Sequence, residues 1–308
     1  MIAGDWQGVW VAMVTPWDVD AGRPRLSALH ALVDRFVAAG VNGLFALGTT
    51  GEGTLLSPQD RKLFAAELLA AVGGRLPVIV HTGHDSSSVA VELSLHAKAH
   101  GAVAVALAPP ARYRLDADEL FRYYATVAEA LGQFPLFLYD IPATTCNPLG
   151  AEFLFRLRER YPNVAGAKVS RTDWITWEAY LRLDQRVPVL VGTDGMIWPL
   201  LAAGAAGVVS GPANLFPELY VELYRVAKSG NIPRARELQA LVWRLCDICH
   251  HASPLAYVKE GLEILGIEAG PVLPPLRRLT PGEREDLARD LKAFAELLAD
   301  AGVKGGDG

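Results

Sequence analysis

The chain has 308 residues, of which 51% are hydrophobic and 20% are charged, a balance that excludes an intrinsically disordered protein and permits a large buried core. The net charge of −5 excludes the basic surface that nucleic acids and anionic membranes require. Three cysteines are too few for a disulfide framework. Residues 1–10 lack the basic and apolar regions of a secretory signal, and the longest apolar runs are too short to span a bilayer, so we expect a soluble, cytoplasmic protein.

Short apolar runs rich in β-branched residues alternate with amphipathic stretches along most of the chain. The runs predict strands at residues 9–15, 43–47, 77–82, 103–108, 135–141, 164–169, 187–192 and 207–210. The stretches between them predict helices at residues 27–39, 58–72, 87–100, 116–131, 151–160, 172–183, 196–203 and 217–228. We expect Ser27, Ser57 and Asp116 to cap their helices.

The alternation of eight strands with eight helices predicts the fold. Strands that are apolar on both faces form parallel sheets covered by helices, and eight of them can close into a (β/α)8 TIM barrel of the α/β class. The competing open, doubly wound sheet usually has a glycine-rich phosphate turn after its first strand, where this chain has Thr15, Pro16 and Trp17. The sequence therefore favours the barrel.

Only helical patterns follow residue 229, at residues 232–251, 254–265 and 281–301. The last is introduced by Thr280, which has the spacing of a capping box with Glu283. We predict a catalytic barrel over residues 1–229 and a C-terminal helical domain over residues 230–308.

Lys168 is the most informative single residue of the predicted barrel, because barrel enzymes carry their catalytic groups at the carboxyl ends of the strands. Its immediate neighbours, in the run VAGAKV, are apolar or glycine. A lysine that faces the barrel interior loses hydration, which favours the neutral, nucleophilic amine needed for a Schiff base with a carbonyl substrate. A structural lysine paired with a neighbouring strand is the alternative.

Two further groups lie at predicted strand ends. Residues 48–53 (GTTGEG) could turn several backbone N–H groups toward a carboxylate or a phosphate, although a simple turn explains the same residues. Tyr139 ends the fifth strand and could transfer a proton at the barrel mouth, or it could be a buried tyrosine with a satisfied hydroxyl.

Cysteine and histidine residues do not form a convincing metal or haem site in the sequence. Cys246, Cys249 and His250 match the spacing of haem attachment, but they lie within a helical pattern and lack a second cysteine pair. His81 and His84 follow the third strand without a partner at metal-ligand spacing. We expect all of these residues to be structural.

Several motifs occur together in a recognisable order. They are residues 14–16 (VTP), 48–52 (GTTGE), 139–142 (YDIP), 166–168 (GAK), 192–194 (GTD) and 204–210 (GAAGVVS). With them the chain resembles the N-acetylneuraminate lyase/dihydrodipicolinate synthase family of pyruvate-dependent class I aldolases over nearly its whole length. The resemblance implies a homotetramer that needs no metal and no dissociable cofactor.

The resemblance also implies roles for individual residues. Lys168 would form the Schiff base with pyruvate or with a 2-keto acid, and Tyr139 would transfer the proton of the hydroxyl group that becomes the aldehyde. Thr49 and Thr50 would hold the substrate carboxylate, Thr50 as part of the catalytic set. The remaining substrate contacts would come from Val209, Ser170, Asp194 and Gly192.

Departures from the synthase pattern favour a particular branch of the family. Thr144 stands where the synthase has a carboxylate-binding arginine, and Ala111 stands where it has a relay tyrosine, with Tyr113 two positions later. Ser170 and Asp194 stand where the sugar-acid aldolases bind a polyol. We therefore expect a lyase acting on 2-keto-3-deoxy sugar acids such as 2-keto-3-deoxygluconate, giving pyruvate and an aldehyde.

Other functions remain as alternatives. Dihydrodipicolinate synthase, which condenses pyruvate with aspartate semialdehyde, is the first, and a non-catalytic protein that binds a 2-keto acid is the second. A dehydratase working through the same Schiff base is a further one. The neuraminate lyase branch is disfavoured because Gly211 stands where that branch has a serine. Arg112 and Arg114 could meet a distal anionic group or could be ordinary surface arginines.

Overall fold

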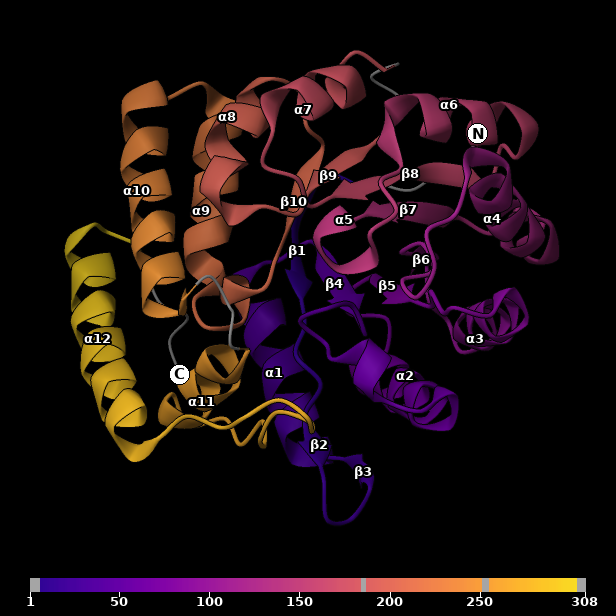
Figure 1. Cartoon of the computed structure of the whole chain (residues 1–308). Helices are drawn as coiled ribbons and strands as arrows, with labels where there is room; N and C mark the ends of the chain where they lie inside the picture. The colour runs from indigo at the N-terminus through magenta and orange to yellow at the C-terminus, as the bar shows by residue number, and fades with distance from the viewer. Residues whose placement is uncertain (1–5, 184–186, 251–254, 304–308) are drawn as a thin grey trace.

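A computed structural model of the chain describes residues 6–183, 187–250 and 255–303. Eight parallel strands close into a barrel in the order β1-β10-β9-β8-β7-β6-β5-β4, in which β1 pairs with both β10 and β4 (Figure 1). The predicted TIM barrel is confirmed. The barrel strands are β1 (Gly8–Ala12), β4 (Gly43–Ala46), β5 (Val78–His81), β6 (Ala104–Leu107), β7 (Leu136–Asp140), β8 (Val164–Val169), β9 (Val189–Val191) and β10 (Gly207–Ser210).

Helices follow the strands and surround the barrel, and a helical C-terminal part lies to one side of it (Figure 1). No helix in the described ranges is both long and apolar enough to cross a membrane. The helices are α1 (Leu26–Ala39), α2 (Pro58–Val72), α3 (Ser87–Ala99), α4 (Ala117–Leu131), α5 (Pro142–Thr145), α6 (Gly150–Arg160), α7 (Trp174–Leu181), α8 (Ile197–Ala202), α9 (Pro217–Ser229), α10 (Ile232–Ile248), α11 (Ala256–Ile264) and α12 (Pro281–Asp300).

Most of the predicted helix caps are present. The Ser57 side chain accepts a hydrogen bond from the Asp60 N–H, and Asp116 and Thr280 each form a complete capping box. The expected cap at Ser27 is wrong, because α1 already begins at Leu26 with Arg25 as its N-cap. The Arg25 N–H donates to Pro16 O at 3.1 Å, which ends the preceding hairpin at this residue and starts the helix immediately.

The sequence patterns missed three short elements near the carboxyl ends of the strands. Strands β2 (Trp17–Asp18) and β3 (Arg23–Pro24) form a small antiparallel hairpin after β1, and α5 follows β7. Beyond residue 230, the described part of the chain contains helices α10, α11 and α12 and no strand. The predicted helix ends at His251 and Pro254 lie outside the described residues. The division into two domains stays a prediction.

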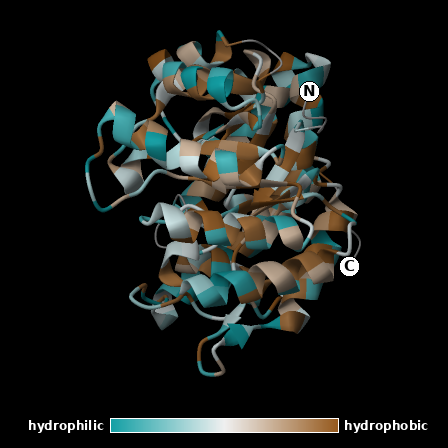
Figure 2. Ribbon diagram, turned by 90° about the vertical axis from the view of Figure 1, so that its right-hand side faces the viewer, coloured by the Kyte–Doolittle hydropathy of each residue, from teal (hydrophilic) through white to brown (hydrophobic). Residues whose placement is uncertain are grey.

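The core has two layers separated by the barrel wall. The larger layer packs the outer faces of the strands against the helices. Figure 2 shows hydrophobic and hydrophilic residues following one another along these helices, as expected for helices with one buried face. The smaller layer fills the barrel interior, where Trp10, Phe45 and Phe137 are fully or almost fully buried. Trp6 packs on Trp10 and on the edge of Phe137, so aromatic side chains close one end of the barrel. Polar groups of the interior gather at the other end.

Candidate active site

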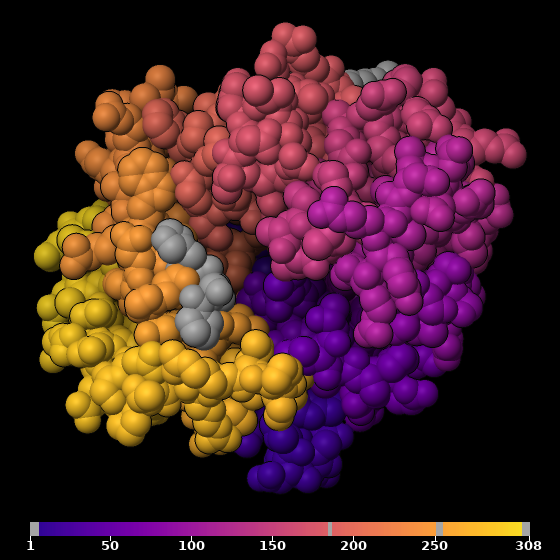
Figure 3. All heavy atoms as spheres, viewed as in Figure 1, coloured from indigo at the N-terminus to yellow at the C-terminus, as the bar shows by residue number. Residues whose placement is uncertain are grey.

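The carboxyl ends of the strands surround a hollow in the molecular surface. Figure 3 shows this hollow near the centre of the face, bordered by purple atoms of the N-terminal half, magenta atoms of the middle and orange atoms of the C-terminal half. The motifs at residues 48–52, 139–142 and 192–194 follow or end strands β4, β7 and β9 on this side. Segments that are far apart in sequence therefore meet at one site.

Lys168 lies on β8 inside the barrel and is only 4% exposed. Its Nζ lies 4.2 Å from the ring centroid of Tyr139 and 4.3 Å from that of Phe45. Both distances place the amino group over an aromatic face, where a cation is attracted to the ring electrons. The two rings hold the amino group near the axis of the barrel and leave it without a described salt-bridge partner.

Tyr139 is the cross-strand neighbour of Lys168 in the pairing of β7 with β8. Its hydroxyl lies 3.4 Å from Thr49 Oγ1. Burial raises the pKa of Tyr139, but the positive charge of Lys168 and hydrogen bonds with Thr49, Lys168 and Ser170 outweigh it, so the pKa lies below its ordinary value. Lowering the pKa of a tyrosine increases the share of its deprotonated form near neutral pH, and that form is the base that can take a proton from a substrate.

The loop at residues 48–52 is tightly folded against the end of β4. The Gly53 N–H donates to Gly48 O at 3.2 Å, and Thr15 Oγ1 donates to Gly51 O at 2.5 Å. A Cβ at Gly51 would approach the Leu47 backbone nitrogen at 2.8 Å, so a side chain there is excluded. The fold leaves Thr49 exposed and Thr50 half-buried at the mouth.

Thr50 and Gly211 lie in contact across the mouth. A Cβ added at Gly211 would lie 2.9 Å from Thr50 Oγ1. A side chain at position 211 would therefore displace the Thr50 hydroxyl. Gly211, which stands where the neuraminate lyase branch has a serine, thus leaves the space that the Thr50 hydroxyl occupies.

Ser170 and Gly192 complete the wall beside Lys168. Ser170 Oγ donates a hydrogen bond to Gly192 O at 3.1 Å. Val209, on β10, is 2% exposed and belongs to the cluster inside the barrel, together with Tyr139. These residues, predicted from the sequence to contact substrate, thus border the same interior space.

Asp194 points into the protein at the start of the segment Asp194–Met196. Its Oδ1 accepts a hydrogen bond from Ser210 Oγ at 2.5 Å, and its backbone carbonyl accepts one from Gln239 Nε2 at 2.9 Å. Burial raises the pKa of the Asp194 carboxyl, while the Ser210 hydrogen bond opposes the rise. Substrate hydroxyl groups would have to bind to an oxygen of Asp194 that Ser210 does not occupy.

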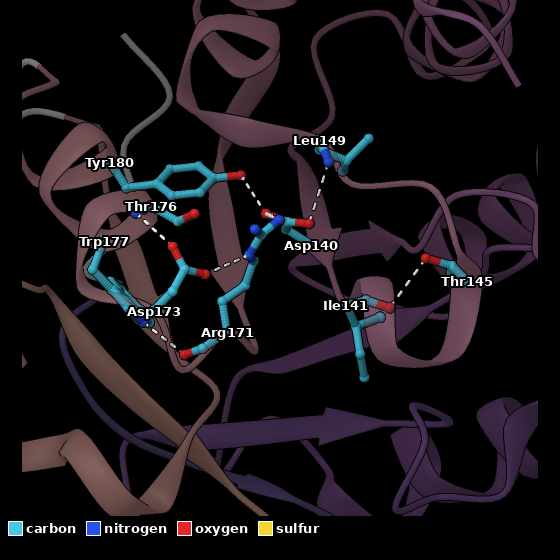
Figure 4. A network of polar contacts seen from close by, with 9 residues as sticks. All are labelled: Asp140, Ile141, Thr145, Leu149, Arg171, Asp173, Thr176, Trp177 and Tyr180. Carbon is cyan, nitrogen blue, oxygen red and sulfur yellow. Dashed lines mark hydrogen bonds and ion pairs between the residues drawn. The ribbon is translucent and has the colours of Figure 1, made fainter.

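A polar network outside the barrel holds the ends of β7 and β8 in register (Figure 4). Asp140 is fully buried, and its carboxylate accepts hydrogen bonds from Tyr180 Oη at 3.0 Å and the Leu149 N–H at 3.2 Å. Arg171 Nη1 lies 3.8 Å from the same carboxylate, while Arg171 Nε donates to Asp173 at 3.2 Å. Because side chains alternate along a strand, this outward network fixes Tyr139 and Ser170 facing inward.

Sequence reasoning did not identify His81 or the Asp140 network as parts of this site. The Ala108 N–H donates to His81 Nε2 at 3.2 Å, so the proton on the ring is at Nδ1, which lies 3.1 Å from Leu47 O. His81 therefore supports the residue that precedes the 48–52 loop, and its ring packs edge-on against Tyr139. The sequence did contain one indication of the Asp140 network, because Asp140 lies between Tyr139 and Pro142 in the motif at residues 139–142.

The other candidate residues lie away from the site or are engaged elsewhere. His84 Nδ1 accepts from the Ser86 N–H at 2.9 Å. Cys246 and Cys249 are buried free thiols, and burial raises the pKa of Cys249 to about 12. Among the described residues, no group of three or more His, Cys, Asp or Glu residues could hold a metal ion.

The positions that distinguish the synthase branch carry no anion-binding group here. Thr144 Oγ1 donates to Ile141 O at 3.3 Å within α5. Tyr113 is 70% exposed. The exposed Arg112 has its Nε 3.7 Å from Asp85, and Arg114 is also exposed.

Most of the chain is similar to known proteins. The model of the dihydrodipicolinate synthetase family matches residues 5–294. A 4-hydroxy-tetrahydrodipicolinate synthase of Methanopyrus kandleri is 33% identical over 96% of this chain and 98% of its own length. An N-acetylneuraminate lyase of Rhizobium meliloti is 32% identical over 95% of this chain and 96% of its own length. A solved prophage protein of the dihydrodipicolinic acid synthase family from E. coli K12, in complex with pyruvate, is 25% identical, with a TM-score of 0.88 over 97% of this chain and 99% of its own.

Proposed function

Because the chain belongs to the dihydrodipicolinate synthetase family, whose members are Schiff-base-forming carbon–carbon lyases, we propose that it cleaves or forms a 2-keto-3-deoxy sugar acid through Lys168. The observation that carries the proposal is the placement of the buried Lys168 amino group against the ring of Tyr139. A nucleophile and a proton carrier in contact are what an aldol cleavage requires.

The reaction follows from these positions. The Lys168 amine attacks the C2 carbonyl of the 2-keto acid and water leaves, which gives an iminium ion. Tyr139 takes the proton of the C4 hydroxyl, the C3–C4 bond breaks, and its electron pair moves into the iminium to form an enamine while the aldehyde leaves. The enamine is protonated at C3, and water then releases pyruvate and restores the amine. The reverse sequence forms the C–C bond.

The substrate carboxylate needs donors close to Lys168. Thr49 and Thr50 offer hydroxyl and backbone N–H groups at the same mouth, with Thr49 Oγ1 3.4 Å from the Tyr139 hydroxyl. The Val209 carbonyl and the Gly192 backbone border the pyruvyl portion. We assign Ser170 and Asp194 to the hydroxylated remainder of the substrate, because Ser170 borders Gly192 together with Lys168 and the charge of Lys168 acts on the Asp194 carboxyl.

The choice of a sugar acid rests on what the mouth lacks. Thr144 uses its hydroxyl within α5 and has no positive charge with which to bind a second carboxylate. A charge-assisted pair with arginine is the strong way to bind that group. A polyhydroxylated aldehyde needs only hydrogen-bonding groups.

Dihydrodipicolinate synthase is the second candidate. It is favoured by the names of relatives, since the similar proteins of Methanopyrus kandleri and Thermomicrobium roseum are both 4-hydroxy-tetrahydrodipicolinate synthases. The two functions share the Lys168 Schiff base with pyruvate and differ only in the aldehyde.

Three experiments test the proposal. Borohydride reduction in the presence of pyruvate should leave a pyruvyl adduct on Lys168, located by peptide mass mapping. A panel of 2-keto-3-deoxy sugar acids should then release pyruvate, and an assay with pyruvate and aspartate semialdehyde should show no condensation. An adduct without any turnover would favour the non-catalytic binding protein, and condensation with the semialdehyde would favour the synthase.

We also expect the enzyme to be a homotetramer. Exposed apolar side chains at the start of α7, Trp174 (51%) and Ile175 (80%), supply surface that a second copy could cover. Light scattering after gel filtration should give four times the mass of the 33.2 kDa chain.

A further inference from the structure

A buried ion pair connects the C-terminal helical part to the loop that we assign to the substrate carboxylate. Glu52 ends the 48–52 motif, and Lys259 lies on α11, 207 residues further along the chain. Lys259 Nζ lies 2.8 Å from Glu52 Oε2, and both side chains are 1% exposed. Burial lowers the pKa of Lys259, and the negative charge of Glu52 opposes that effect.

Residues of the C-terminal part satisfy the rest of this pair. The second carboxylate oxygen, Glu52 Oε1, accepts a hydrogen bond from the Leu273 N–H at 2.5 Å. Lys259 Nζ also donates to Pro271 O at 2.8 Å. Buried ion pairs contribute little net stability compared with apolar residues of the same volume. The pair therefore calls for an explanation other than stability.

The backbone of Glu52 shows what the pair could control. Glu52 has a φ of 53°, a left-handed conformation that a residue with a side chain rarely adopts. Its N–H donates to Thr49 O at 3.1 Å, closing the turn that contains Thr49 and Thr50. Fixing the Glu52 side chain from the C-terminal part thus fixes the turn that presents both threonines to the mouth.

We propose that Lys259 is a positioning residue for substrate binding: it holds Glu52 so that Thr49 and Thr50 face the carboxylate of the 2-keto acid. The inference rests on the proposed function, which makes that loop the carboxylate site. It gives the helical C-terminal part a role in substrate recognition, although Lys259 itself does not touch the substrate. Removing the pair should weaken the binding of carbonyl compounds that carry a carboxylate and spare those that do not.

The test compares two carbonyl compounds on the full-length protein. Wild type, Lys259→Met and Glu52→Gln are reduced with borohydride over a range of pyruvate or acetaldehyde concentrations, and the adduct on Lys168 is quantified by peptide mass mapping. In K259M the pyruvate concentration for half-maximal trapping should rise by about tenfold or more, the size expected for a lost charge-assisted contact. The acetaldehyde concentration for half-maximal trapping should change by less than about twofold, because acetaldehyde has no carboxylate to lose a contact.

A matched control is Lys228→Met. Lys228 Nζ donates to Ala205 O at 3.1 Å, before the start of β10 and therefore at the opposite end of the barrel. K228M should trap both compounds as the wild type does. The double variant E52Q/K259M should resemble K259M, because two residues that act as a unit have non-additive effects.

Each outcome decides the question. Equal losses with pyruvate and acetaldehyde, or no loss with either, would overturn the positioning role. If circular dichroism shows that K259M is unfolded, E52Q decides by the same readouts, since it keeps the shape of the side chain and removes its charge. If the wild type forms no pyruvyl adduct on Lys168, the proposed function fails and this inference falls with it.

Discussion

Gly192 and Lys168 are packed so closely that no side chain fits between them. A Cβ built at position 192 would lie 3.1 Å from Lys168 Cε and would overlap Ser170 Oγ. The absence of a side chain at this position is therefore part of the site, because it determines the path of the lysine side chain toward the barrel axis.

The first prediction concerns this contact. Gly192→Ala should push the Lys168 side chain aside and reduce the rate of borohydride trapping with pyruvate by about tenfold or more, since a misplaced nucleophile loses its alignment. Gly195→Ala is the matched control in the same loop, because a Cβ at Gly195 meets no atom within 4 Å. Equal trapping rates in the two variants would contradict the prediction.

The second prediction separates Schiff-base formation from C–C cleavage. Tyr139→Phe keeps the ring beside Lys168 and removes the hydroxyl near Thr49. The kcat for pyruvate release from the sugar acid should fall by about 10²- to 10⁴-fold, the usual loss when a positioned proton carrier is removed. The pyruvyl adduct should still form on Lys168, as mass mapping can show. Full retention of kcat would exclude the proposed proton transfer.

The third prediction tests whether Asp194 binds the hydroxylated part of the substrate. Asp194→Asn keeps the shape of the side chain beside Ser210 and removes its charge. The KM for the sugar acid should rise by about five- to tenfold, because a charge-assisted hydrogen bond contributes more than a neutral one. The pyruvate concentration for half-maximal trapping should stay the same. A purely structural role would instead lower the melting temperature and leave KM unchanged.

The fourth prediction follows from the buried imidazole of His81. Burial is the main cause that lowers its pKa to about 3; the charge of Arg61 acts in the same direction, and the Leu47 hydrogen bond opposes the shift. The unfolded imidazole titrates near its ordinary pKa of about 6.5. Between these values the unfolded state binds one more proton than the folded state, so the free energy of unfolding falls by about 1.4 kcal/mol for each unit of decreasing pH.

Urea unfolding at pH 5.5 and pH 4.5 measures this dependence. Between pH 5.5 and pH 4.5 the free energy of unfolding of the wild type should fall by about 1.4 kcal/mol more than that of His81→Asn, because the variant has no imidazole to protonate on unfolding. At pH 7.5 the histidine makes no such contribution, and any difference there reflects lost contacts alone. The same loss in both proteins would show that His81 does not set the acid sensitivity.

Local pattern was sufficient to predict the barrel and much of its mouth. The run around Lys168 is apolar on both faces, and β8 has the predicted bounds, Val164–Val169. Ser57, Asp116 and Thr280 predicted helix starts because a cap is a contact within a few residues. The placement of Lys168 beside Tyr139 then follows from the order of adjacent strands.

Contacts between distant residues could not be predicted in this way. Nothing near Lys259 in sequence indicates that its partner is Glu52, 207 residues earlier. The imidazole of His81 is fixed by the backbone of Leu47 and Ala108, and a backbone group has no sequence signature. Strands β2 and β3 have two residues each, too few to show a period.

The closure of the barrel has a consequence for how the protein is made. Gly8 at the start of β1 pairs with Gly207 at the start of β10, so one edge of the first strand has no partner until the last strand of the barrel has been synthesised. At a translation rate of about 5–20 residues per second, that edge waits on the order of 10–40 s on the ribosome. An unpaired apolar strand edge is a template for aggregation. We therefore expect the yield of soluble enzyme to depend on growth temperature and chaperone supply more than on the stability of the finished barrel.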